Sequence, residues 1–175
     1  MIFSHRLTYA FLNHFFKQKI LVMGSTIEKT IEILNDLILI NSDRSTAYEK
    51  AMKLIAVEDS ELAQIFKTMA SDSRKYLYEL AGHLDPSGQE FLKVIPPTSG
   101  RVYQKWTGEK NSFIGKDRYS LLSSSELEEK AIENAYNEVM KEELPEEIKN
   151  IIAEQKNNLQ KSYDRIRSMQ QMQHA

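Results

Sequence analysis

The residues that could carry chemistry in this chain are polar side chains set into otherwise apolar helical lines: Asn41, Ser73, Tyr76, Glu129 and Gln155. Their carboxylate, amide and hydroxyl oxygens are ligand types that hard and borderline cations accept. Glu129 is the only carboxylate of the five, however, and a bridged pair of metal ions needs several carboxylates to balance its charge. We therefore favour a hydrogen-bonded polar layer that fixes the register of packed helices.

A second arrangement would hold one cation, iron or manganese, between Glu129 and the nearby carboxylates Asp43 and Glu126. We treat it as the alternative and expect no bound cofactor. The sequence has no Ser-His-Asp arrangement, no phosphate-binding Gly-rich loop and no dinucleotide-binding fingerprint. No catalytic residue is predicted, and the chain is not expected to be an enzyme.

Two further groups of charged residues have simple interpretations. Glu79 and His83 lie four residues apart, with Asp85 close behind, and we interpret them as an ordinary helix-end cluster in preference to a surface metal site. Three residues flank the apolar line of an earlier helix, and we expect them to form salt bridges with Arg74 on the next helix. These three residues are Asp43, Arg44 and Glu49.

The composition is that of one globular domain. The chain has 175 residues, of which 41% are hydrophobic and 27% charged, and its net charge of -2 argues against a nucleic-acid partner. The absence of cysteine excludes disulfides and thiolate metal sites and fits a cytoplasmic location. Only six glycines and four prolines, with few β-branched runs, indicate an all-α chain.

Apolar residues that recur every three or four positions predict the first helix. A capping box at Ser25 and Glu28 starts it, and it extends to about residue 56. Its buried line is read as Ile27, Ile31, Leu34, Ile38, Asn41, Ser45, Tyr48, Met52 and Ile55.

Three more helices follow from the same spacing. Asp59 or Ser60 caps the second, Asp117 caps the third, and Pro145 with two acids beside it starts the fourth. Their buried lines are Leu62, Phe66, Met69, Ser73, Tyr76, Leu80 and His83; Leu122, Ser125, Glu129, Ile132, Tyr136 and Val139; and Ile148, Ile152, Gln155, Leu159, Ser162, Ile166 and Met169.

A long connection separates the second and third helices. The second helix stops at Asp85-Pro86-Ser87-Gly88, and residues 89–116 follow as an irregular crossover with a short helix around 101–106. The crossover is rich in apolar side chains, so it either folds over the helices or mediates self-association. These side chains are Phe91, Val94, Ile95, Val102, Tyr103, Trp106, Phe113 and Ile114.

Residues 1–22 differ from the rest because they are aromatic and basic and contain no acid. Three interpretations stay open: a targeting segment, an upstream stretch of a chain that truly starts at Met23, and an amphipathic surface helix. We predict an N-terminal extension over 1–22 that is untranslated or disordered, a bundle over 23–170 and a frayed tail over 171–175.

Four motifs give the run from residue 26 to residue 169 a resemblance to a known group. Residues 34–51 follow the pattern LNxLIxINxDRxxxYExA, and residues 115–118 form a GKDR-like start to the third helix. Phe66, Ala70 and Arg74 have the spacing F-x3-A-x3-R, and Leu144-Pro145 precede the fourth helix. With these motifs the chain resembles an uncharacterised bacterial group within the ferritin-like superfamily.

The resemblance implies an antiparallel four-helix bundle with a long crossover between helices two and three, and it suggests a stress-related role. Metal-binding ferritin-like proteins carry Glu, Glu-x-x-His, Glu and Glu-x-x-His on successive helices. Only Glu129 keeps a ligand type at the equivalent positions. These are Asn41, Ser73 with Tyr76, Glu129, and Gln155 with Asn158.

The expectation that follows is a non-enzymatic, homo-oligomeric protein with a structural, self-associating or stress-related role and no identified small-molecule substrate. The alternative is a divergent metal-binding ferritin-like protein with a reduced carboxylate site. A third interpretation, if residues 1–22 are present in the protein, is a membrane-surface protein tethered by that segment.

Overall fold

The computed structural model describes residues 3–84, 99–110, 112–113 and 115–172, and over 3–25 it describes the backbone only. Five helices follow one another along these residues, and none of them forms a strand. The prediction of an all-α chain is therefore confirmed. The helices are α1 (Phe3–Ile55), α2 (Ser60–Gly82), α3 (Arg101–Glu109), α4 (Arg118–Val139) and α5 (Glu146–Gln171).

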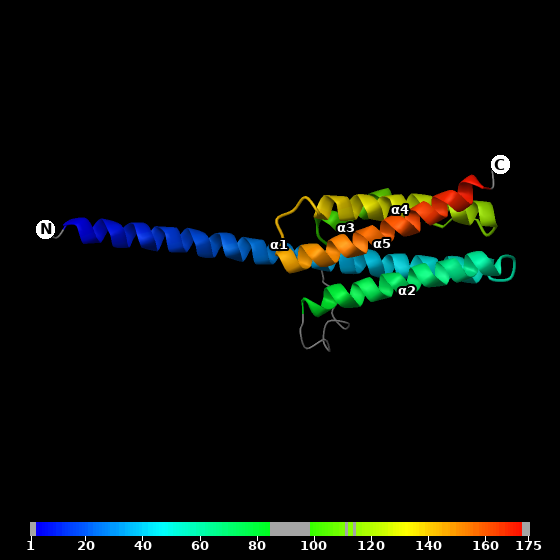
Figure 1. Cartoon of the computed structure of the whole chain (residues 1–175), viewed down its shortest axis with the longest axis horizontal. Coiled ribbons are helices and arrows are strands. Elements are labelled where there is room, and N and C mark those ends of the chain that lie inside the picture. Colours follow the sequence, from blue (N-terminus) through cyan, green and yellow to red (C-terminus); the bar gives the residue numbers. More distant parts are fainter. Residues whose placement is uncertain (1–2, 85–98, 111, 114, 173–175) are drawn as a thin grey trace.

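Helix α1 is much longer than the sequence suggested. It runs without interruption through Ser25 and Glu28, so the predicted helix start at that capping box is wrong, and residues 3–22 are part of the same helix. The segment 3–24 has no proline and a single glycine, so nothing in it stops a helix that propagates from the bundle. Figure 1 shows the N-terminal part of α1 projecting beyond the other helices.

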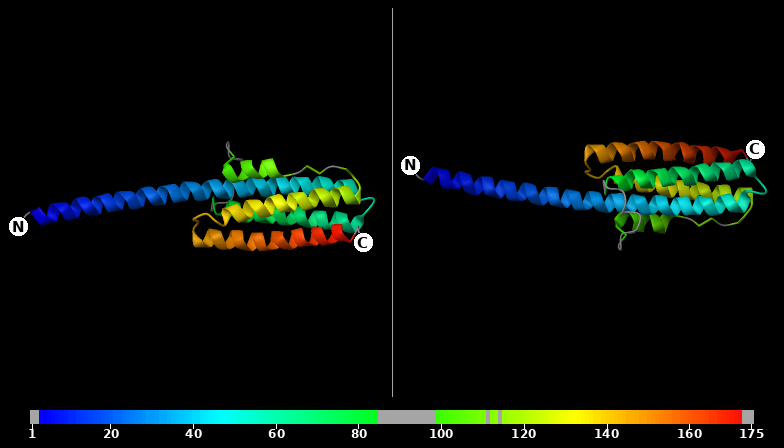
Figure 2. Two further views of the ribbon diagram at one scale, coloured as in Figure 1. Left: turned by 90° about the horizontal axis from the view of Figure 1, so that it is seen from above. Right: turned by 90° about the horizontal axis from the view of Figure 1, so that it is seen from below.

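Figures 1 and 2 show α1, α2, α4 and α5 lying side by side as a helical bundle. Short connections join α1 to α2 and α4 to α5, so the two helices of each pair run in opposite directions. Helix α4 begins beside the turn between α1 and α2, where Arg118 forms an ion pair with Asp59. The crossover therefore returns the chain from the far end of α2 to this turn.

The predicted caps of α2 and α4 are confirmed. Asp59 Oδ1 accepts a hydrogen bond from Leu62 N at 2.9 Å, and Asp117 Oδ1 accepts one from Ser120 N at 3.0 Å. Each carboxylate satisfies a backbone N–H that has no partner within its own helix. Pro145 directly precedes α5, whose first turn contains two glutamates, as expected from the helix dipole.

The short crossover helix α3 lies against α1 and α4, and its N-terminus is capped by a carboxylate from α1. Asp36 accepts hydrogen bonds from the backbone N–H groups of Gly100 at 2.7 Å, Val102 at 3.0 Å and Tyr103 at 3.1 Å. Because these N–H groups lack partners within α3, the buried Asp36 side chain holds the crossover to the bundle.

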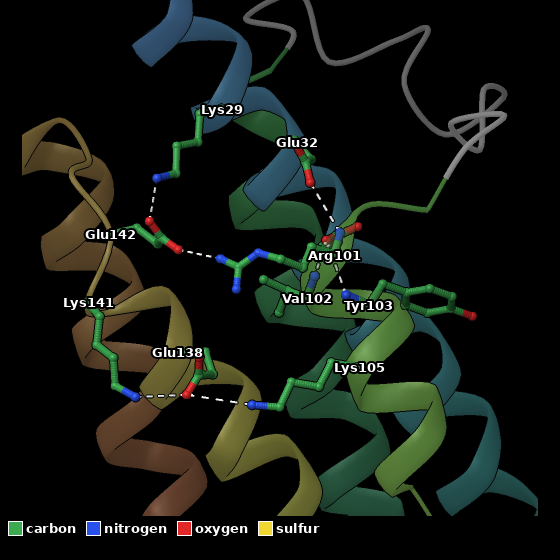
Figure 3. A network of polar contacts seen from close by, with 10 residues as sticks. Lys29, Glu32, Arg101, Val102, Tyr103, Lys105, Glu138, Lys141 and Glu142 are labelled. Atoms are coloured by element: carbon green, nitrogen blue, oxygen red, sulfur yellow. Dashed lines mark hydrogen bonds and ion pairs between the residues drawn. The ribbon is translucent and has the colours of Figure 1, made fainter.

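Ion pairs surround this junction, as Figure 3 shows. Glu142, three residues beyond the end of α4, pairs with Lys29 of α1 and with Arg101 of α3. Glu32 accepts a hydrogen bond from the backbone N–H of Arg101 at 3.1 Å. Three helices thus meet around the first turn of α3.

Val102 and Trp106 bury the inner face of α3, with Trp106 only 1% exposed. The interpretation that the crossover folds over the helices is confirmed for this segment. Phe113 also packs inward, against the rings of Tyr48 and Phe66. The predicted break at 85–88 and the apolar residues Phe91, Val94, Ile95 and Ile114 lie outside the described residues.

The apolar core falls into two clusters. One contains the middle of α1, the end of α2, α3, the second half of α4 and the start of α5. The other contains the end of α1, the start of α2, the start of α4 and the end of α5. Buried polar residues lie between the two clusters along α1, α2 and α4: Asn41, Arg44, Ser45, Ser73, Ser125, Glu128 and Glu129. Gln155 lies within the first cluster, between Ile152 and Leu159.

The buried face of α1 is wider than the predicted line and starts later. Six residues of that line are buried as predicted: Leu34, Ile38, Asn41, Ser45, Tyr48 and Ile55. Ile27 is 56% exposed and Ile31 is 44% exposed, so their assignment to the core is wrong. The completely buried residues of this helix include Leu37, Ile40, Asn41, Arg44, Tyr48, Ala51 and Ile55. The wider face includes Arg44, whose ion-pair partner Glu129 lies on α4.

Candidate functional site

The centre of the bundle holds an ion pair between Arg44 of α1 and Glu129 of α4. Arg44 Nε lies 2.9 Å from Glu129 Oε1, and Arg44 Nη2 lies 2.9 Å from Glu129 Oε2. This is the parallel two-bond geometry in which a guanidinium fits a carboxylate best. Both side chains are at most 1% exposed, so the pair is removed from water.

Neighbouring groups complete the hydrogen bonding of the pair. Arg44 Nη1 donates to Ser73 Oγ at 2.5 Å and to the carbonyl of Met69 at 3.1 Å. The Tyr48 hydroxyl donates to Glu129 Oε1 at 2.7 Å, and its ring lies 5.0 Å from the Arg44 guanidinium carbon. The charges are therefore compensated inside a low-dielectric core.

The same contacts fix the protonation states of the site. Burial alone would lower the pKa of Arg44, but the carboxylate of Glu129 raises it above its usual value. Burial and the charge of Glu129 raise the pKa of the Tyr48 hydroxyl well above its usual value. The site therefore holds a permanent cation beside a phenol that does not ionise, and neither group is suited to proton transfer near neutral pH.

A second hydrogen-bonded chain lies one step along the bundle. Asn41 Nδ2 donates to the Tyr136 hydroxyl at 2.8 Å, and that hydroxyl donates to Gln155 Oε1 at 2.9 Å. Gln155 Nε2 donates to Glu79 Oε2 at 2.8 Å. Side chains from all four long helices are therefore linked across the bundle. Burial raises the pKa of the neighbouring Tyr76 to about 12.

The structure brings the five predicted residues into two neighbouring networks, in which other side chains connect four of them. Tyr76 takes part through its backbone carbonyl, which accepts a hydrogen bond from Gln155 Nε2 at 3.4 Å. Ser73 and Glu129 meet through Arg44, and Asn41 and Gln155 meet through Tyr136. Tyr136 was predicted to be buried, whereas Arg44 was placed outside the core. The signal for Arg44 was Glu129 itself, because a buried carboxylate on a facing helix requires a cation or a proton.

The other predicted groups are dispersed. Glu49 forms the expected ion pair with Arg74. Asp43 instead accepts a hydrogen bond from Lys110 Nζ at 2.8 Å. Arg44 lies in the core and pairs with Glu129. His83 Nδ1 lies 3.9 Å from Glu147, while Glu79 binds Gln155, and Asp85 lies outside the described residues.

No described part of the chain assembles a metal site from carboxylates and imidazoles. Among the described residues, no three His, Cys, Asp or Glu side chains gather closely enough to hold an ion. Glu129 is already neutralised by Arg44, and Asp43 by Lys110. The single-cation arrangement of Asp43, Glu126 and Glu129 therefore finds no support in this geometry.

A family model for a domain of unknown function, DUF2383, matches residues 29–142. The chain belongs to this family. The DUF2383 match covers the second half of α1 and all of α2, α3 and α4, so it includes Arg44, Ser73, Glu129 and Tyr136. Gln155, on α5, lies beyond it. No curated protein and no solved structure matches the chain.

Within the described residues, none of the helices combines the length and apolar character needed to cross a bilayer.

Proposed function

We propose that this DUF2383 protein is a non-enzymatic, ferritin-like four-helix bundle that acts as a self-associating structural protein and binds no metal ion in its core. The observation that carries the proposal is the Arg44–Glu129 pair, which fills the centre of the bundle with a guanidinium. A fixed organic cation there neutralises the carboxylate that a metal ion would need.

The topology supports the ferritin-like arrangement. Two helical hairpins, α1–α2 and α4–α5, are joined by a crossover that returns the chain to the α1–α2 turn, where Arg118 meets Asp59. One long crossover between two hairpins is the connectivity of ferritin-like bundles. The polar layer lies in the bundle core on facing helices, which is where such bundles build their metal sites.

Self-association is supported by an apolar face on α1 where that helix leaves the bundle. Ile27 and Ile31 lie four residues apart on α1 and are 56% and 44% exposed. Beside them is a hollow of about 300 Å³ that Leu34, Leu84 and Ile148 help to line. Exposed apolar surface of this kind marks protein interfaces, and a second copy of the chain is the partner we propose.

Elemental analysis of protein from cells supplemented with iron and manganese tests the absence of a core metal. We expect metal far below one ion per chain in the wild type and in an Arg44→Met variant. The matched control is Glu129→Ala, which removes the only carboxylate of the layer's candidate ligand set. Near-stoichiometric metal in the wild type that disappears in Glu129→Ala would contradict the proposal.

Sedimentation velocity tests the self-association. We expect an Ile27→Ser/Ile31→Ser variant to be monomeric at concentrations where the wild type is not. Leu127→Ser is the matched control, because Leu127 is 53% exposed on α4, away from this face. A monomeric wild type, or equal effects of the two variants, would contradict the role of the α1 face.

A further inference from the structure

A second buried carboxylate, Glu128, lies next to Glu129 in sequence but points to different surroundings. Its side chain is 2% exposed, and its Oε2 atom has no hydrogen-bond partner in the described structure. Glu129, by contrast, accepts three hydrogen bonds. Buried carboxylate oxygens are rarely left without a partner, because the lost hydration is not replaced.

Glu128 lines a cavity of about 440 Å³ between α1, α4 and the segment that follows α3. This volume lies in the range of pockets that bind small molecules. Apolar side chains form part of the wall, and the ring of Phe113 is held in place by the rings of Tyr48 and Phe66. The lining includes Asp43, Ala47, Leu54, Lys110, Phe113 and Glu128.

The two cations whose charges act on Glu128, Lys110 and Arg44, are bound to other groups. Lys110 Nζ lies 2.8 Å from Asp43 Oδ2 and 4.4 Å from the centre of the Trp106 ring. Asp43 also accepts a hydrogen bond from the Tyr103 hydroxyl at 3.0 Å. The guanidinium of Arg44 is bound to Glu129. Glu128 is therefore the acidic group of the cavity that lacks a bound cation among the described residues.

We propose that this cavity binds a small primary amine, with the ammonium group on the carboxylate of Glu128 and the apolar part of the ligand against Phe113 and Leu54. An ammonium supplies both the charge and the N–H donor that this carboxylate lacks. The apolar wall favours a short hydrocarbon chain or ring. Lys50 and Lys110 at the same cavity disfavour a second cationic group on the ligand.

A divalent cation fits this cavity less well than an amine. Asp43 is neutralised by Lys110, so a metal ion would find one free carboxylate, fewer oxygen ligands than magnesium or manganese requires. An anionic ligand would be repelled by the negative charge of the Glu128 carboxylate. Burial and the charge of Glu129 raise the pKa of Glu128 to about 7. A bound ammonium would oppose this shift, because a nearby positive charge favours the ionised carboxylate.

Isothermal titration calorimetry of the full chain with phenethylamine tests the inference near neutral pH. We expect saturable binding to the wild type and at least about tenfold weaker binding to Glu128→Gln, which loses the charged acceptor. Phenethyl alcohol, which has the same shape without the ammonium, should not bind. Glu126→Gln is the matched control on α4 and should bind like the wild type.

A second variant keeps the carboxylate and removes the space. Ala47→Phe places a large side chain in the cavity wall, so binding should be lost although Glu128 is unchanged. Circular dichroism confirms that each variant is folded. Equal binding to the wild type and Glu128→Gln, binding of the alcohol, no binding of the amine, or stoichiometric Mn²⁺ binding at Glu128 would each overturn the inference.

Discussion

Arg44 and Glu129 form two parallel hydrogen bonds of 2.9 Å each at the centre of the bundle, with both side chains excluded from water. The pair joins α1 to α4 through two residues that lie 85 positions apart in the chain. Ser73 and Tyr48 orient the two charges further. A geometry with so many directional contacts fixes the relative height of these helices.

The first prediction follows from the difference between breaking this pair and replacing it. Glu129→Ala leaves the guanidinium of Arg44 buried without its carboxylate, so we expect a loss of about 3–5 kcal/mol in the free energy of unfolding. An Arg44→Met/Glu129→Leu variant removes both charges and should lose much less. Urea denaturation measures the free energy of unfolding of both variants and of the wild type. Equal losses in the single and double variants would contradict the coupling.

The second prediction concerns the anchoring of α3. Asp36→Ala removes the acceptor of three backbone N–H groups, so α3 should detach while the four long helices stay folded. Trp106 is the only tryptophan of the chain and is 1% exposed, so its fluorescence should shift to longer wavelength. Circular dichroism should change little, because α3 has nine residues.

The control for this prediction is Glu32→Ala, which removes one partly exposed contact to Arg101 N. It should leave the emission of Trp106 close to that of the wild type. An unchanged Trp106 spectrum in Asp36→Ala would show that apolar packing alone holds α3.

The third prediction compares two glycines at and within α3. A Cβ atom on Gly100 would lie 2.6 Å from Asp36 Oδ2 and 2.5 Å from Glu32 Cγ, so Gly100→Ala should loosen α3 and expose Trp106. Gly108 has nothing within 4 Å of a built Cβ, so Gly108→Ala should stabilise the helix by about 0.5–1 kcal/mol. Thermal unfolding monitored by Trp106 fluorescence distinguishes the two variants. Shifts of the unfolding midpoint in the same direction for both would contradict the prediction.

The sequence allowed much of this fold to be predicted where local chemistry determines it. Asp59 and Asp117 are strong N-caps, and both start the helices expected of them. The start of α1 could not be predicted in this way. Ser25 and Glu28 match a capping box, but both residues also occur inside helices, and no proline upstream forces a stop.

The candidate site shows the corresponding limit for side chains. The position of Glu129 in the core followed from the spacing of α4, which the structure confirms. Arg44 was missed because an arginine beside an apolar line is usually exposed. Only the packing of α1 against α4 reveals that the guanidinium and the carboxylate compensate each other. The unpartnered oxygen of Glu128 could likewise not be predicted from sequence spacing, because the surroundings of this side chain depend on how α1, α4 and the segment after α3 pack together.

The last prediction is a pH dependence that arises from Glu128. Burial, followed by the charge of Glu129, raises its pKa from 4.5 to about 7, while Lys110 and Arg44 oppose the shift and Asp43 adds to it. Between these two values the folded chain holds the proton more tightly than the unfolded chain. The contribution of Glu128 to the free energy of unfolding therefore falls as the pH rises through this range.

Glu128→Gln removes this effect, since an amide does not ionise. Relative to the wild type, the variant should have nearly the same stability at about pH 5 and be about 2–3 kcal/mol more stable at about pH 8. Urea denaturation of both proteins across this range provides the measurement. Glu126→Gln, on the same helix, should follow the wild type at every pH. Parallel stability profiles of the wild type and Glu128→Gln would mean that solvent or another group neutralises Glu128 in the folded protein.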